Sequence, residues 1–248
     1  MINVCEGLST LRSILVNSLP FAHPLDSLTV CNLCLAPTGG PRLCHQCLQA
    51  LPHNHNPCLR CALPLPLLRR GICGQCLQRA PAHQHSLAPF LYRFPVDHMI
   101  TRYKYSGERA MGFALTQAWL TAFSGNGSYT QEPLPQALIP CPISPQQLRW
   151  RGFNQSAEIA WQLGRALGIP VLPRLLTRIG HQPRQATLDR QQRRRNLRHA
   201  FVCTGAPPAR VALVDDVITT GATADAMAQA VLAAGAEVVH IWALARTP

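Results

Sequence analysis

Four Cys-x-x-Cys pairs lie within residues 31–80, and they constrain the fold more than any other feature of the chain. A Cys-x-x-Cys turn aims two thiolates at one metal ion, and two such turns complete a tetrahedral zinc site. The segment is otherwise rich in Pro, His and Arg, with little apolar periodicity, so it needs such a staple to fold. The pattern predicts two structural zinc ions, contributing on the order of 10 kcal/mol to folding. The expected ligands are Cys31, Cys34, Cys44, Cys47, Cys58, Cys61, Cys73 and Cys76.

The pairing of these turns has two solutions. Sequential pairing gives one zinc ion to each half of the segment, whereas interleaved pairing joins the first turn to the third. We favour the sequential solution because the stretches between paired turns are short. Either solution fills all four positions around each metal ion, which is typical of structural rather than catalytic zinc.

The composition narrows the class of protein. Apolar residues make up 47% and charged residues 14%, which is not the composition of a disordered chain. No run of 18 apolar residues occurs, so we expect no membrane insertion. No secretory signal is recognisable, and paired cysteines without one indicate metal binding in the cytoplasm rather than disulfides.

The net charge is +12, and Lys104 is the only lysine beside a large number of arginines. Because guanidinium groups bind phosphates and carboxylates in a bidentate manner, this composition indicates anionic ligands.

Three zones follow one another along the chain. Residues 1–30 have the apolar spacing of a helix, and residues 31–80 hold the cysteine pairs. Residues 86–248 have the pattern of an α/β domain. Within that domain we expect strands at 138–139, 211–214 and 238–244 and helices at 155–167 and 223–234. The strand–helix–strand order over 211–244 is typical of a parallel crossover unit. We expect loops at 124–136 and 174–200, the second of them mobile.

The most informative run is residues 211–223, where a short apolar strand leads into paired carboxylates, a Thr/Gly turn and a helix. Hydroxyls and backbone N–H groups at a helix N-terminus make a site for a phosphate group. Asp215 and Asp216 would repel a phosphate, but they suit the hydroxyls of a sugar attached to it. The pattern therefore predicts a ribose 5-phosphate ligand. Its phosphate contacts would be Thr219, Thr220, Gly221, Ala222 and Thr223.

This run resembles the PRPP-binding signature of type I phosphoribosyltransferases. Three further stretches narrow the resemblance to the ComF/GntX family of competence and DNA-utilisation proteins. They are the run from Pro140 to Gln155, the run from Arg178 to Phe201, and the cysteine module. The resemblance implies a type I phosphoribosyltransferase-like parallel sheet flanked by helices, preceded by a double zinc ribbon.

The resemblance also implies roles for individual residues. Asp215 and Asp216 would bind the ribose hydroxyls, and residues 219–223 the 5-phosphate. The loop 141–152 would meet pyrophosphate through Arg149 and Arg151, and Arg193 would lie on a flexible lid. Mg²⁺ would be held mainly by PRPP oxygens, because the chain offers few spare carboxylates. Cys141 is expected to be a buried thiol rather than a nucleophile.

The sequence leaves open whether the chain is an enzyme. Few residues follow the last expected strand, so a base-recognising hood would have to come from residues 1–30 or 86–110. Tyr103, Lys104 and Tyr105 cluster in the second of these stretches, although the aromatic residues suit packing equally well. The alternatives to a role in DNA uptake are a phosphoribosyltransferase of nucleotide salvage and a non-catalytic PRPP-sensing regulator.

A basic stretch also indicates nucleic acid. Residues 145–200 contain 11 arginines against Glu158 and Asp189. Such a stretch suits phosphate backbones, and the resemblance adds single-stranded DNA and proteins of a DNA-uptake machinery as expected partners. Trp150, Phe153 and Trp161 are candidates for base stacking, although helix spacing favours a core position for Trp161.

Overall fold

The computed structural model describes residues 29–39, 42–66, 68, 71–125, 133–179 and 200–248. The expected helix at the start of the chain lies almost wholly outside this part, and Arg193 lies outside it too.

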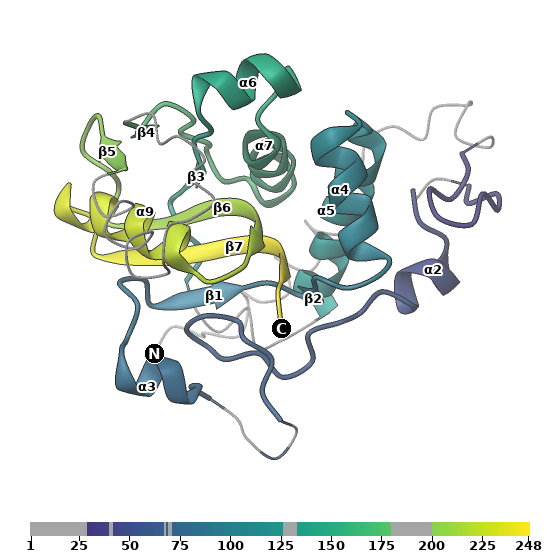
Figure 1. Ribbon diagram of the computed structural model, residues 1–248, viewed down its shortest axis with the longest axis horizontal. Coiled ribbons are helices and arrows are strands. Elements are labelled where there is room, and N and C mark those ends of the chain that lie inside the picture. Colours follow the sequence, from purple (N-terminus) through teal and green to yellow (C-terminus); the bar gives the residue numbers. More distant parts are fainter. Residues whose placement is uncertain (1–28, 40–41, 67, 69–70, 126–132, 180–199) are drawn as a thin grey trace, which may run out of the picture.

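A parallel sheet of five strands forms the centre of the described structure (Figure 1). Its long strands are β3 (Ala137–Pro140), β6 (Arg210–Ile218) and β7 (Val238–Arg246). Two short strands, β1 (His85–Leu87) and β2 (Phe90–Leu91), both pair with β7, so the sheet order is β1/β2–β7–β6–β3. Because all pairings are parallel, the carboxyl ends of β3 and β6 meet at one edge of the sheet.

Helices cover both faces of this sheet. One face packs against α4 (Val96–Tyr105), α5 (Arg109–Gly125) and α7 (Gln155–Leu167), and the other packs against α9 (Ala222–Ala233). The period of two along β6 explains the arrangement: Ala212 and Val214 join the core beneath the three helices, whereas Val211 and Leu213 join the core beneath α9. The predicted fold class, a parallel sheet flanked by helices behind a cysteine-rich module, is confirmed.

Some helices and strands have the bounds predicted from the sequence, and others are longer than predicted or were not predicted. The predicted helix 155–167 coincides with α7, and α9 begins one residue before the predicted 223. The strand predicted at 211–214 continues to Ile218, so both aspartates lie within β6. The prediction of a loop throughout 174–200 was wrong for β4 (Leu176–Arg178), which pairs antiparallel with β5 (Phe201–Cys203).

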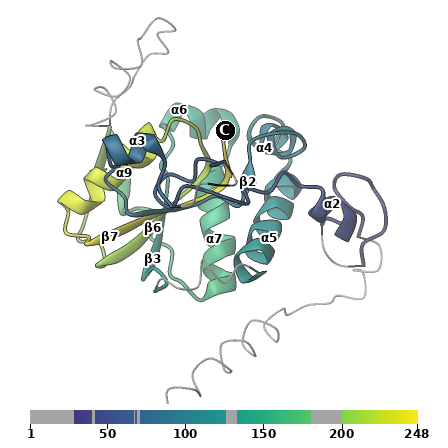
Figure 2. The ribbon, with the colours of Figure 1, turned by 90° about the horizontal axis from the view of Figure 1, so that it is seen from below.

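The cysteine segment lies along the sheet domain and is hydrogen-bonded to it at several places. At one of them Asn32 donates a hydrogen bond of 2.9 Å to the carbonyl of Ala110 in α5. The short helix α3 (Gly74–Gln78) and the first turns of α9 line one cavity, while α2 (His45–Gln49) lies beyond α5 (Figure 2). No helix in the described ranges combines the length and apolar content required to cross a membrane.

Candidate functional site

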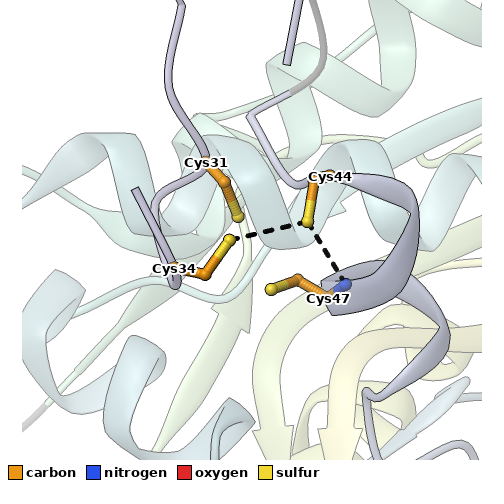
Figure 3. A group of neighbouring side chains, drawn as sticks. All are labelled: Cys31, Cys34, Cys44 and Cys47. Carbon is orange, nitrogen blue, oxygen red and sulfur yellow. Dashed lines mark hydrogen bonds between the residues drawn. The ribbon is translucent and has the colours of Figure 1, made fainter. Parts of the chain in front are cut away.

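Two groups of four cysteines bring their sulfur atoms together, each within 4.8 Å of the others. The groups are those of sequential pairing: Cys31, Cys34, Cys44 and Cys47 (the first cluster, Figure 3), and Cys58, Cys61, Cys73 and Cys76 (the second cluster). Each offers four thiol ligands and no other donor, which fits a structural zinc ion.

Local geometry builds each cluster from short turns. The second Cys-x-x-Cys turn of each cluster opens a short helix, and Cys44 and Cys73 cap those helices. The backbone N–H of Cys47 donates to the Cys44 sulfur at 3.5 Å, and that of Cys76 donates to the Cys73 sulfur at 3.4 Å. Such N–H donors stabilise a thiolate, the form of cysteine that binds zinc.

The candidate sugar-phosphate site lies where β6 gives way to α9. Residues 219–221, which we name the phosphate turn, connect the two elements, and Thr219 and Thr220 are exposed. Gly221 has φ +76°, a conformation that L side chains rarely adopt, so a glycine is required where the turn enters the helix. The N-cap residue Gly221 has no side chain to cap the helix, and the Ala222 N–H donates a long hydrogen bond of 3.4 Å to the Thr220 hydroxyl. The helix N-terminus therefore leaves donors for an anionic ligand.

Asp215 lies just before this turn and is held from two sides. Its Oδ1 accepts hydrogen bonds from the Ser156 hydroxyl at 3.0 Å and from the Asp216 backbone N–H at 2.9 Å. Ser156 occupies the first turn of α7, which Asn154 caps. Burial, together with the neighbouring Asp216 charge, raises the pKa of Asp215 to about 7. The carboxyl group thus titrates near neutral pH.

Asp216 is buried and paired with Lys104, the only lysine of the chain. The Lys104 Nζ lies 2.7 Å from the Asp216 Oδ2. Burial alone would lower the pKa of Lys104, but the charge and hydrogen bond of Asp216, together with the Asp215 charge, outweigh burial, so the pKa is raised. Lys104 therefore stays charged and offsets one of the two carboxylates.

The titration of Asp215 predicts a pH dependence of stability. Its pKa is about 7 in the fold against an ordinary value of 3.8, so between these pH values the folded chain holds a proton that the unfolded chain has released. The free energy of unfolding should therefore fall as pH rises from about 4 to 7, by up to about 4 kcal/mol. Urea unfolding at several pH values checks this. The Asp215→Asn variant should lose that part of the dependence, and equal pH profiles for the two chains would contradict the assignment.

The loop after β3 lies at the same sheet edge as the two aspartates. It contains a helix, α6 (Pro145–Arg151), that carries Arg149 and Arg151 in its last turn. The Asn154 side chain closes the loop by donating to the Cys141 carbonyl at 3.0 Å. Cys141 is buried, as predicted, and burial and the two aspartates raise its thiol pKa, which does not suit a nucleophile.

A buried arginine that the motifs did not indicate joins the phosphate turn to the second cluster. Arg246, at the end of β7, donates from Nε to the carbonyl of Cys61 at 3.0 Å. Its Nη1 donates to the Ile218 carbonyl at 3.0 Å and also to the Thr219 carbonyl. One guanidinium thus holds a zinc-ligand segment and the start of the phosphate turn together.

The sequence-predicted site residues fall into three groups. Asp215 and Asp216 lie on β6, whose last two residues separate them from the phosphate turn, and Arg149 and Arg151 lie in the loop at the same sheet edge. Arg193 lies outside the described residues. Sequence reasoning missed Ser156 and Arg246 and gave Lys104 no role beside the carboxylates. The only signal for Lys104 was that it is the single lysine of the chain.

These features define an α/β protein in which two four-cysteine clusters adjoin a parallel sheet with a strand-end carboxylate pair. No family model matches the chain. It is 32% identical to "Competence protein F" of Haemophilus influenzae over 219 residues, covering 87% of this chain and 93% of the relative. It is also 32% identical to "DNA utilization protein YhgH" of Escherichia coli K12 over 222 residues, covering 88% of this chain and 97% of the relative. The chain belongs to the ComF family.

A solved structure was also found to be similar. It is the crystal structure of a purine phosphoribosyltransferase from Pyrococcus horikoshii, with a TM-score of 0.30 and 16% sequence identity. The similarity covers 66% of this chain and 87% of that one.

Proposed function

We propose that this chain acts in DNA uptake or utilisation by binding PRPP at the end of β6 and single-stranded DNA through its arginine-rich stretch, residues 145–200. The observation that carries the proposal is the adjacency of two carboxylates, an exposed Thr/Gly turn and a helix N-terminus whose N-cap residue is glycine. This combination suits a sugar phosphate, because the carboxylates can accept hydrogen bonds from the sugar hydroxyls, and the turn and helix N-terminus can donate to the phosphate. The names of the curated relatives support the DNA-related role.

PRPP would be held by three sets of groups. Asp215 and Asp216 would accept hydrogen bonds from the ribose hydroxyls, and residues 219–223 would donate to the 5-phosphate. Arg149 and Arg151 would bind the pyrophosphate, and Arg193, outside the described residues, is the third proposed arginine contact. Mg²⁺ would accompany PRPP and neutralise its charge, bound mainly by the oxygens of the ligand. Where PRPP occupies Asp216, Lys104 has to give up at least part of its ion pair.

Titration calorimetry of the zinc-loaded chain with PRPP and Mg²⁺ tests this part of the proposal. We expect saturable binding of one PRPP per chain. A flat titration would contradict the site. A panel of nucleobases with PRPP then separates a transferase of nucleotide salvage from a non-catalytic PRPP-sensing regulator. Pyrophosphate release with any base supports the transferase, and no release supports the regulator or the DNA-handling role.

Binding of single-stranded DNA predicts a steep dependence on salt. Each phosphate that an arginine neutralises contributes about 0.7 to the slope of log affinity against log salt for single strands. With 11 arginines in residues 145–200, we expect at least three contacts and a slope steeper than about −2. Fluorescence anisotropy of a labelled oligothymidylate across a salt series measures the slope. Salt-independent binding would rule out phosphate contacts by this stretch.

The compartment and the protein partners complete the proposal. We infer a cytoplasmic location from the thiol-rich clusters, because zinc-binding cysteines stay reduced there. Proteins of a DNA-uptake machinery are the proposed partners, in line with the name of the Haemophilus influenzae relative.

A further inference from the structure

Two large aromatic side chains lie together on the surface with more than half of their area exposed. Tyr105, the last residue of α4, is 53% exposed, and Trp150, in the last turn of α6, is 65% exposed. Their ring centroids are 5.8 Å apart, and the ring planes are inclined by 50°. The two residues come from separate helices, and neither ring is buried in a core. The fold therefore brings two rings together without using them to fill its interior.

An arginine adjoins both rings. The Arg151 guanidinium carbon lies 5.2 Å from the Tyr105 ring centroid and 6.0 Å from that of Trp150. Arg151 thus places a positive charge beside the faces of both exposed rings.

A second arginine–aromatic contact nearby differs from that of Arg151, because it holds two helices together. The Arg109 guanidinium lies 4.9 Å from the ring of Phe153, but that ring is buried. Arg109 also makes an ion pair of 3.1 Å with Glu158. That contact ties α5 to α7. The contacts of Arg151 with two exposed rings serve no comparable packing role.

The exposed rings lie close to the candidate sugar-phosphate site. Tyr105 directly follows Lys104, whose ammonium group contacts Asp216. Trp150 lies in the loop after β3, at the sheet edge where β6 also ends. A ligand stacked on the rings would therefore lie beside the carboxylate pair.

We propose that Tyr105, Trp150 and Arg151 form a stacking platform for an unpaired base of single-stranded DNA. The proposal rests on the proposed function and deepens it by naming where a base is held. Exposed aromatic faces stack on any base, and such contacts contribute about 1–3 kcal/mol per base. In the chain without PRPP, the Arg151 guanidinium is free to bind the phosphate next to the stacked base. The aromatic platform thus matches both chemical parts of a single strand.

The experiment compares the zinc-loaded full chain with variants of two exposed tryptophans. Trp150 belongs to the platform, whereas Trp161, 54% exposed on α7, is the matched control. Anisotropy measures the affinity for oligothymidylate and for an abasic strand of equal length. We expect Trp150→Ala to weaken oligothymidylate binding about tenfold, and Trp150→Phe to retain most of it, because one stacked base is lost or kept. Trp161→Ala should bind as the unmodified chain does. Calorimetry should give similar PRPP affinities for the unmodified chain and for the Trp150→Ala, Trp150→Phe and Trp161→Ala variants.

Each other result bears on a different part of the proposal. Equal oligothymidylate affinity for Trp150→Ala and Trp161→Ala would overturn the platform while leaving DNA binding elsewhere on the chain intact. Equal affinity of the unmodified chain for the abasic strand would overturn base stacking. If the chain bound thymidine monophosphate through Trp150 but no oligothymidylate, the single-strand assignment would fall. If it bound PRPP but no DNA at all, the platform and the DNA part of the proposed function would fail together.

Discussion

Replacing both aspartates of the site with asparagine (Asp215→Asn with Asp216→Asn) should weaken PRPP binding by at least about 100-fold. Hydrogen bonds to charged groups contribute about 1.5–3 kcal/mol each, and above pH 7, where Asp215 is ionised, this variant loses the charge of two acceptors. Asparagine also presents an amide N–H₂ group where a ribose hydroxyl needs an acceptor. Titration calorimetry with PRPP and Mg²⁺ measures the loss, and elemental analysis should still find two zinc ions per chain.

The controls for this variant have to distinguish a loss of contacts with PRPP from a loss of folding. Asp216→Asn leaves the Lys104 ammonium group without its partner, so thermal unfolding must show that the variant is folded before it is titrated. Glu237→Gln changes an exposed carboxylate next to β7 and should bind PRPP as the unmodified chain does. Undiminished PRPP binding by the folded double variant would show that the aspartates do not contact the ribose.

Removing the second zinc cluster should affect both stability and PRPP binding. Serine at Cys58 and Cys61 removes two ligands of one metal ion, whose binding contributes on the order of 10 kcal/mol to folding. The segment has only a small apolar cluster of its own around these cysteines. When the second cluster is lost, the backbone around Cys61 is no longer held in place, and Arg246 loses its hydrogen bond to the Cys61 carbonyl. Arg246 also binds the Ile218 carbonyl, so the phosphate turn is held less firmly. We expect one zinc ion per chain, rapid proteolysis within residues 58–76, and PRPP affinity reduced at least tenfold.

The first cluster offers a matched comparison. Serine at Cys31 and Cys34 also removes one zinc ion, but this cluster adjoins α5 and has no contact with Arg246 among those described. PRPP affinity should then change little. Equal losses of PRPP affinity in the two double variants would contradict a specific coupling through Arg246. Retention of two zinc ions by either variant would contradict the ligand sets.

Local patterns in the sequence predicted the parts of the structure that depend on neighbouring residues. The four Cys-x-x-Cys turns predicted two four-cysteine groups, because only two residues separate the ligands within each turn. The apolar spacing of 155–167 and its terminal Gly168 predicted both ends of α7. The strand, turn and helix around Asp215 were likewise predicted from one short run, residues 211–223.

Contacts between segments that are far apart in the sequence could not be predicted from local patterns. Arg246 and Cys61 are 185 residues apart, and no periodicity links them. The ion pair of Lys104 with Asp216 similarly depends on how α4 packs over β6. The prediction of a core position for Trp161 was wrong for a simpler reason. Two residues along a helix turn the side chain by about 200°, so Trp161 faces away from the side that Ile159 and Leu163 bury. Phe153, a stacking candidate, is buried.

The ion pair between Lys104 and Asp216 also gives the molecule an internal reporter. Lys104 is the only lysine, so amine-selective acylation modifies a single side chain in the described part of the chain. In the resting state its ammonium group is bound at 2.7 Å and largely shielded from solvent. A sugar phosphate that takes over Asp216 would release this amine or cover it. Mass spectrometry of the acylated peptide would then record occupancy of the pocket without any assay of turnover.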